Sequence, residues 1–241
     1  MTGTILNAVA VIIGSLIGIL LGNRLPDKVR ETVLDGLGLM VLVVGISMAL
    51  QSQNILIPMF SVLVGGIIGE LLRIEDGLQA VGIWLERKTG RYLGRGERGN
   101  VVRAFVTASL VFCVGPLAIL GSIQDGLTGD TQLLVIKSTL DGFASLAFAA
   151  TLGPGVILSA LAVFVYQGAI SLAAHGLSNV LGEVTQQTPW VIELTATGGV
   201  LIMGIGLLLL ELKRIRVGNL LPAVALAPLI VVILAAIGIS L

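Results

Sequence analysis

Thirty-four consecutive residues without a charge, between Asp35 and Glu70, constrain this chain more than any other feature. A single helix of that length would measure about 51 Å, whereas the hydrocarbon core of a bilayer is about 30 Å thick. The polar run Gln51–Asn54 divides the segment, which predicts two membrane helices at about 34–50 and 55–72. The chain is therefore expected to cross a lipid bilayer more than once.

Other uncharged runs extend this prediction along the chain. Only 12% of the residues are charged, against about 25% in a soluble domain, so lipid must cover most of the surface. Further membrane helices are expected at about 2–21, 104–124, 132–152, 156–174, 191–210 and within 219–241. The sequence thus predicts an all-α integral membrane protein with about eight transmembrane helices, forming one polytopic domain over residues 1–241.

The distribution of Lys and Arg predicts the orientation. Of the 14 basic residues, all except Lys137 fall in the first, third and seventh loops or at their edges, and the second, fourth and sixth loops have none. Cytoplasmic loops are rich in Lys and Arg, so both termini are expected outside. No basic residue precedes the first apolar run, which is typical of an uncleaved N-outside anchor.

The third loop, at about 73–101, contains the largest polar region. Apolar residues recur there at helical spacing, at Ile74, Leu78, Val81 and Leu85. This pattern predicts an amphipathic helix on the cytoplasmic membrane surface, followed by a basic, Gly-rich connector.

Two pairs of short motifs suggest internal symmetry. Leu34-Asp35-Gly36 resembles Leu140-Asp141-Gly142, and Thr107-Ala108-Ser109 resembles Thr195-Ala196-Thr197. In the predicted topology the members of each pair run in opposite directions, as in an inverted repeat of three-helix units.

Glycine is abundant, at 32 of 241 residues, and recurs four residues apart in apolar helices. Examples are Gly14 with Gly18 and Gly65 with Gly69. Such faces let helices approach closely, within one chain or between chains. A homo-oligomer formed through these Gly-rich faces is therefore an expectation.

Lys137 and Asp141 form the most informative pair of charges, because they lie one helical turn apart inside a predicted membrane helix. An ionisable residue at membrane depth suggests a functional site. One interpretation is a carboxylate that binds solute or ion and is balanced by Lys137. The other is a buried ion pair that fixes helix packing.

The run Gly121–Asp130 places polar residues directly after an apolar helix that contains Pro116. Ser122, Gln124 and Asp125 could line an outer vestibule or a re-entrant ligand site, with Asp125 as a second partner for Lys137. The alternative is a turn in which Asp130 caps the next helix.

Other polar residues in apolar surroundings are expected to have structural roles. Glu70 lies one turn before Arg73 and is expected to snorkel to the interface. Asp35 is expected to cap a helix, and Glu193 to open one. Asn7, Gln167 and Asn219 are expected to hold helices together through their amides. The full set of transport or binding candidates is Asp125, Lys137, Asp141, Ser122, Gln124, Thr107, Ser109, Glu70 and Gln167.

Several function classes are disfavoured by what the sequence contains. One Cys and one His allow neither an intramolecular disulfide nor a site of several His ligands. Motifs of metalloproteases and P-loop enzymes are missing, and the net charge of zero gives no sign of nucleic-acid binding. No catalytic residue, metal or cofactor is expected.

Motifs along the whole chain resemble the bacterial membrane proteins grouped as domain of unknown function 554, the YqgA-like and YdfK-like proteins. The resemblance rests on Thr4–Asn7, Gly36–Leu39, Gly65–Asp76, Phe112–Gly115, Gly121–Leu127 and Lys137–Gly142. It implies a location in the bacterial inner membrane and supplies no activity.

Together these features favour an inner-membrane transporter or channel for a small solute or ion. The alternative is a non-transporting scaffold or regulatory protein that acts through the 73–101 loop.

Overall fold

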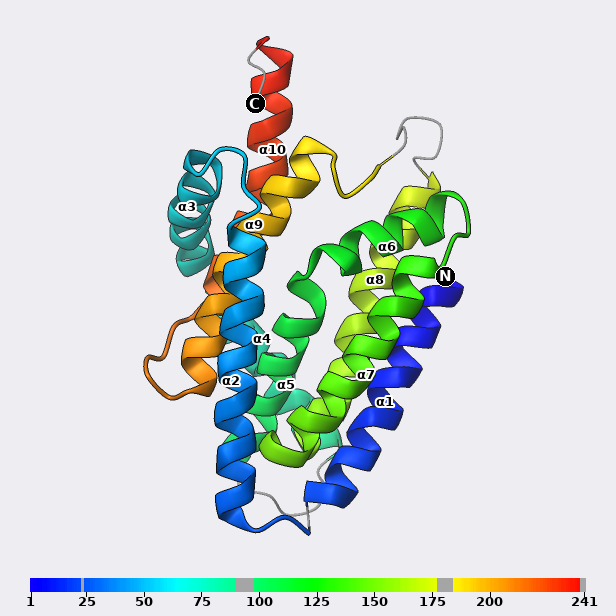
Figure 1. The fold of residues 1–241 in the computed structure, drawn as a ribbon, viewed down its shortest axis with the longest axis vertical. Helices are drawn as coiled ribbons and strands as arrows, with labels where there is room; N and C mark the ends of the chain where they lie inside the picture. The colour runs from blue at the N-terminus through cyan, green and yellow to red at the C-terminus, as the bar shows by residue number, and fades with distance from the viewer. Residues whose placement is uncertain (23, 90–97, 177–183, 239–241) are drawn as a thin grey trace. The chain divides into compact units, whose positions relative to one another are not determined.

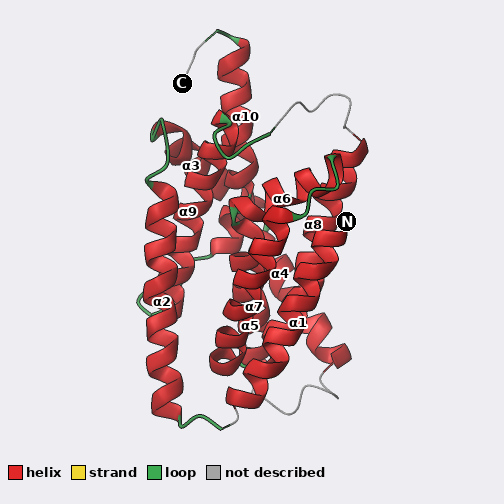
Figure 2. Cartoon of the chain, turned by 45° about the vertical axis from the view of Figure 1, so that its right-hand side comes forward, coloured by secondary structure: helices red, strands yellow, loops and turns green. Residues whose placement is uncertain are grey.

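The chain folds into helices throughout residues 1–22, 24–89, 98–176 and 184–238, which the computed structural model describes (Figures 1 and 2). The elements in chain order are α1 (Thr2–Gly22), α2 (Asp27–Ala49), α3 (Leu56–Leu72), α4 (Ile74–Thr89), α5 (Arg98–Val114), α6 (Pro116–Leu127), α7 (Gln132–Leu152), the 3-10 helix η1 (Pro154–Leu158), α8 (Ser159–Gly176), α9 (Pro189–Leu209), the 3-10 helix η2 (Val217–Leu220) and α10 (Pro222–Ala236). This confirms the predicted all-α fold.

Within those residues, six helices are long and apolar enough to cross a membrane. Two further pairs, α3 with α4 and α5 with α6, are bent by 54° and 60° and give eight spans if each pair counts as one. The prediction of about eight membrane helices is therefore confirmed.

The predicted breaks between neighbouring helices are confirmed. The polar run after Ala49 separates α2 from α3. Gly153 has a φ of 95°, a conformation that favours glycine because it has no Cβ. Pro154 follows and opens η1, so the chain ends α7 and reverses there.

The predicted start of the second helix was wrong. We expected 34–50, with Asp35 as a cap, whereas α2 begins at Asp27 and Asp35 is an exposed residue inside it. Uncharged residues mark only the part of a helix that lipid can cover. A helix can extend beyond the lipid with charged residues, which hydropathy does not count.

The predicted single helix over 104–124 was also wrong, because α5 and α6 meet at a 60° bend beside Gly115 and Pro116. Proline lacks the N–H that would continue the helical ladder, and its ring clashes with the preceding turn. The run Gly121–Asp130 is helical as far as Leu127, so the turn that was the alternative interpretation is limited to its last three residues.

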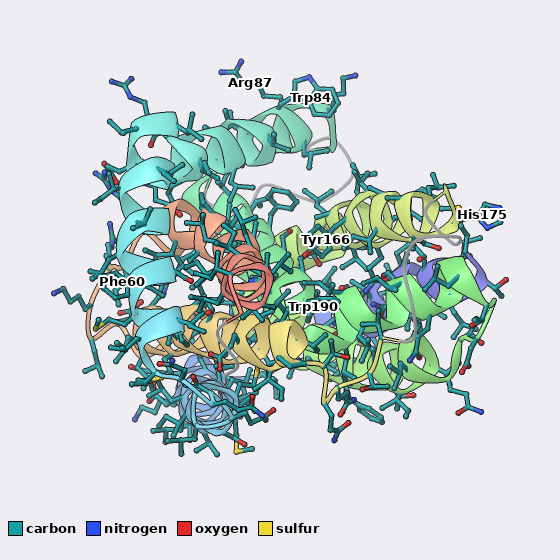
Figure 3. All side chains as sticks on the ribbon, turned by 90° about the horizontal axis from the view of Figure 1, so that it is seen from above. Phe60, Trp84, Arg87, Tyr166, His175 and Trp190 are labelled. Carbon is teal, nitrogen blue, oxygen red and sulfur yellow. The ribbon has the colours of Figure 1, made fainter. Side chains whose placement is uncertain are left out.

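The amphipathic segment forms α4, as predicted. Leu85 is buried, and the backbone at Gly82 lies against the side chains of Val102 and Phe105 of α5. On the other face, Trp84 is exposed and carries the ammonium of Lys88 over its ring. Figure 3 shows Trp84 and Arg87 together on this outer face of α4. The connector at 90–97 lies outside the described residues.

The chain divides into two compact units. Unit 1 contains Met1–Gly36, Gln79–Cys113 and Leu117–Val184, and unit 2 contains Leu37–Leu78, Val114–Pro116 and Thr185–Leu241. Each unit combines elements from both halves of the sequence, so its boundaries differ from those of the predicted three-helix repeat. The inverted repeat and the single polytopic domain stay predictions.

Unit 1 is built on the packing of α1 against α7, which run side by side in Figures 1 and 2. Gly14, Gly18 and Gly22 place the α1 backbone directly against backbone atoms of α7. A Cβ at any of the three would overlap a carbonyl oxygen of Gly142, Leu146 or Ala150. The contacts advance together along both helices, so α1 and α7 are parallel, as the predicted topology requires.

Unit 2 uses the same kind of packing between other helices. Gly45 of α2 and Gly199 of α9 bring their backbones together, and Gly65 of α3 lies against Ala223 of α10. Buried Ile57, Ala227 and Val231 form an apolar cluster with Trp190 packed on it. These Gly faces are occupied within the chain, and oligomerisation through Gly-rich faces stays a prediction.

Candidate functional site

A buried ion pair lies on α7 in unit 1. The Lys137 ammonium is 2.6 Å from Oδ2 of Asp141, and both side chains are at least nine-tenths buried. Leu134, Ser138 and Ser145 share this buried face of the helix. The pairing expected from the i, i+4 spacing is therefore present, and it is shielded from the surface.

Asn7 of α1 completes the pair. Its side-chain Nδ2 donates a hydrogen bond of 2.9 Å to Oδ2 of Asp141, the same oxygen that accepts from Lys137. This fixes the amide so that Oδ1 points elsewhere, and that buried oxygen has no hydrogen-bond partner in the described structure. Sequence reasoning assigned Asn7 only a packing role. The signal available was a Thr4–Asn7 pair, one turn apart, inside an otherwise apolar helix.

Asp125 is buried on α6 and does not pair with Lys137 as predicted. Its Oδ1 lies 3.0 Å from the amino group of Met1, and its Oδ2 is buried without a partner. Asp125 therefore lies beside the N-terminal end of α1, and the next residue, Gly126, packs on α8. Next to Asp125, the carbonyl of Gly126 contacts Nδ1 of His175 at 3.2 Å, and His175 lies at the end of α8 (Figure 3).

Gln167 of α8 is fully buried, and neither its Oε1 nor its Nε2 has a hydrogen-bond partner among the described residues. Ser171, one turn further along α8, also has a buried, unpartnered hydroxyl. So do Thr4 of α1 and Ser109 of α5. Buried polar atoms nearly always have a hydrogen-bond partner, so each of these atoms is a place where water or a ligand could bind.

The other predicted residues of unit 1 have local roles. The Ser122 hydroxyl donates 2.6 Å to the carbonyl of Ala118 on its own helix. Gln124 is half-buried, and its backbone carbonyl accepts from the hydroxyl of Thr128. Thr107 is buried on α5. Asp130 accepts from the backbone N–H of Gln132 and so shapes the start of α7, as the turn interpretation proposed.

Glu70 belongs to unit 2, and more than half of its side chain is exposed. Its carboxylate accepts from Arg216 at 2.6 Å and from the side-chain amide of Asn219 at 2.6 Å. Asn219 Oδ1 in turn accepts from the backbone N–H of Glu75. The expected neighbour Arg73 ends α3 with a φ of 53°. These contacts hold the bend between α3 and α4 against η2, which is a structural role.

Glu193 was underestimated from the sequence. It lies inside α9, fully buried, and accepts hydrogen bonds from the Ser52 hydroxyl and from the backbone N–H groups of Gln53 and Asn54. It therefore caps the connection between α2 and α3 rather than its own helix. Sequence spacing carries no sign of this contact, because the partners are about 140 residues apart.

Two bacterial proteins are similar to this chain over nearly their whole length. The uncharacterized membrane protein YdfK of Bacillus subtilis (strain 168) is 30% identical over 242 residues, covering 99% of each chain. The uncharacterized protein YqgA of Escherichia coli (strain K12) is 29% identical over 225 residues, covering 93% of this chain and 94% of YqgA. No solved structure matches the chain.

The family described as "Protein of unknown function (DUF554)" matches residues 2–232. The match includes the Lys137–Asp141 pair, Asn7, Asp125 and Gln167. It also agrees with the resemblance noted in the sequence. The chain belongs to the DUF554 family of membrane proteins.

Proposed function

We propose that this protein is a membrane transporter for a small solute or ion, and that its binding site is the polar core of unit 1. The observation that carries the proposal is the concentration of buried charge and of unpartnered polar atoms around Asp141 and Gln167. Both are costly in a membrane interior, and they are typical of substrate and ion pathways.

The polar atoms belong to helices that meet in one unit. Asn7 of α1 reaches Asp141 of α7, and the Met1 amino group reaches Asp125 of α6. Gly168 of α8 lies against the side chains of Met1 and Thr4. A solute that entered this core would therefore contact four helices, α1, α6, α7 and α8, at once.

A fully buried valine is next to the polar residues on each of α1 and α8. Val11 comes one turn after Asn7, Val163 comes one turn before Gln167, and both are fully buried. The N-terminal end of α1 lies beside Gly168, and α1 also contacts η1, which precedes α8, so the two helices are antiparallel. The two valines therefore lie at a similar depth.

Orientation and location are part of the proposal. The concentration of basic residues in alternate loops supports two outside termini in a bacterial inner membrane. With that orientation Thr4 and Asn7 lie toward the outer end of α1, and Asp141 lies near the middle of α7. A transport protein, and not an enzyme, is what these features support.

The proposal is tested with purified protein in two measurements. The first is the shift in thermal unfolding caused by a library of small solutes and ions, since binding to the folded state raises its apparent stability. The second is uptake of each stabilising compound into proteoliposomes. Uptake should be lost in Asp141→Asn and kept in Asp35→Asn, a matched change at an exposed carboxylate in the same Leu-Asp-Gly context. Equal uptake by both variants would contradict the proposal.

The alternative function, a scaffold acting through the 73–101 loop, gives a different result. Replacing residues 90–97 with a short Gly-Ser linker should leave uptake unchanged in a transporter. In a scaffold it should abolish every phenotype of the protein, including any linked to a solute.

A further inference from the structure

One group of buried side chains in the polar core indicates the charge class of the solute. We define the α1–α8 polar cluster as Thr4, Asn7, Asp125, Gln167 and Ser171. Each contributes at least one buried oxygen atom that has no hydrogen-bond partner in the described structure, and Gln167 contributes its Nε2 as well. These atoms are what a ligand would contact.

The members of the cluster are neighbours in space. Thr4 and Asn7 are one turn apart on α1, and Gln167 and Ser171 are one turn apart on α8. A Cβ at Gly168 would lie 4.0 Å from Cγ2 of Thr4, and a Cβ at Gly126, next to Asp125, would overlap the backbone of Ser171. The contacts bring the elements that carry the cluster, α1, α6 and α8, side by side, and Asn7 connects α1 to Asp141.

The charges around the cluster cancel in pairs. Lys137 is paired with Asp141, and the amino group of Met1 is paired with Asp125. A ligand with a net charge would leave an uncompensated charge in a low-dielectric interior, which is unfavourable. A ligand without net charge avoids that cost.

The unpartnered atoms are of both kinds, acceptors and donors. A metal cation would satisfy Asn7 Oδ1, Asp125 Oδ2 and Gln167 Oε1 but would leave the Gln167 Nε2 donor unpaired. An anion would satisfy that donor but would leave those three acceptors unpaired and would face the carboxylate of Asp125. Only a molecule with both donors and acceptors can satisfy the whole set.

We propose that the α1–α8 polar cluster binds a small polar solute of zero net charge that carries both hydrogen-bond donors and acceptors. The inference rests on the proposed transport function and names its substrate class. Uncharged amides and polyols and zwitterionic amino acids belong to this class. Inorganic ions and simple carboxylates do not.

The experiment uses the full-length protein in detergent and in proteoliposomes, with two panels of probes at equal ionic strength. The zero-charge panel is urea, acetamide, glycerol and glycine, and the charged panel is sodium, potassium, ammonium and acetate. Thermal unfolding is followed through the fluorescence of the two tryptophans, and uptake is followed with isotope-labelled probes. We expect at least one zero-charge probe to raise Tm and to enter proteoliposomes, while the charged probes do neither.

Variants locate the binding at the cluster. Gln167→Leu removes a donor and an acceptor and should weaken binding of the active probe by about tenfold or more, since a buried hydrogen bond contributes roughly 1–1.5 kcal/mol. Ser61→Ala is the matched control, because Ser61 also has a buried, unpartnered hydroxyl but lies on α3 in unit 2. It should leave binding unchanged. If Gln167→Leu does not fold, Ser171→Ala and Thr4→Val replace it and should each reduce binding.

The outcomes separate this inference from the proposed function. Uptake of charged probes alone would overturn the zero-charge inference and leave transport standing. If no probe from either panel binds or is taken up, both the zero-charge inference and the proposed transport function are overturned. Binding of a zero-charge probe that Gln167→Leu, Ser171→Ala and Thr4→Val leave unchanged would overturn the assignment to this cluster.

Discussion

Asn7 and Asp141 lie 134 residues apart in the sequence and are joined by a buried hydrogen bond of 2.9 Å from the Asn7 amide to the Asp141 carboxylate. The same carboxylate oxygen accepts from Lys137. The interface between α1 and α7 therefore combines close glycine packing with one charged hydrogen-bond centre. Perturbing that centre should affect both the stability of unit 1 and the binding site that we propose.

Asn7→Leu should destabilise the protein, because it leaves the Asp141 carboxylate with one buried donor fewer. The expected loss is about 1–3 kcal/mol, seen as a lower midpoint of thermal unfolding. Gln51→Leu is the control, since Gln51 is an exposed amide that bonds only to the backbone of its own turn. Equal unfolding midpoints for the two variants would show that the Asn7–Asp141 bond does not stabilise unit 1.

Lys137→Met and Asp141→Asn should each reduce the yield of folded protein. Removing one member of a buried ion pair leaves the other charge without its partner, at a cost of about 3–5 kcal/mol, whereas replacing both can be nearly neutral. The double variant should therefore recover the yield, measured by size-exclusion chromatography, and still fail to take up solute. A folded double variant with full uptake would remove Asp141 from the proposed site and leave only the α1–α8 polar cluster.

Much of the fold could be predicted because lipid imposes simple rules on sequence. Bilayer thickness predicts that the uncharged run between Asp35 and Glu70 forms two helices, and backbone chemistry predicts a break at Gly153-Pro154. Both features are present in the structure. The ends of helices were less predictable. The charged first turns of α2 lie beyond the apolar part, so hydropathy does not show them.

The candidate site was only partly predictable, for a different reason. Lys137 and Asp141 are on one helix, and their spacing alone places them together. Asn7 reaches Asp141 across a helix interface, and the Met1 amino group reaches Asp125 in the same way. Contacts of this kind depend on how helices pack, which one sequence does not reveal.

Gly18→Ala should destabilise the packing of α1 on α7. The added Cβ would overlap the carbonyl oxygen of Leu146, and overpacking of this kind typically costs about 1–3 kcal/mol. Gly36→Ala is the matched control, because nothing lies within 4 Å of its Cβ position. That change should be neutral or stabilising by roughly 0.5–1 kcal/mol, since alanine favours helix over glycine. A Tm for Gly18→Ala as high as that for Gly36→Ala would contradict the close approach.

Reporter fusions in four loops test the proposed orientation, in which both termini are outside. A phosphatase or fluorescent reporter fused after residues 95, 129, 180 and 215 should report inside, outside, outside and inside in turn. The second fusion is placed in the turn at Gly129, because residues up to Leu127 are helical. An inside signal at 129 would contradict the proposed orientation.

Glu193→Leu should be more damaging than any other single change in unit 2 that we consider. The carboxylate accepts hydrogen bonds of 2.8, 2.8 and 3.1 Å from Ser52, Gln53 and Asn54. Two of these donors are backbone N–H groups at the connection before α3, and leucine would leave them without an acceptor. Hydrogen bonds to a charged group contribute about 1.5–3 kcal/mol each, so the loss should exceed that range.

Glu193→Gln separates the role of the charge from the role of the acceptor. Its Oε1 can still accept from the backbone of Gln53 and Asn54, and the Ser52 hydroxyl can rotate to accept from Nε2. The loss should therefore be smaller, at about 1–2 kcal/mol. Glu31→Leu, at an exposed carboxylate of α2, is the control for loss of charge. Thermal unfolding should rank the variants as Glu31→Leu, Glu193→Gln and Glu193→Leu in order of falling Tm. If Glu193→Leu unfolds no earlier than Glu31→Leu, the carboxylate does not hold the connection between α2 and α3.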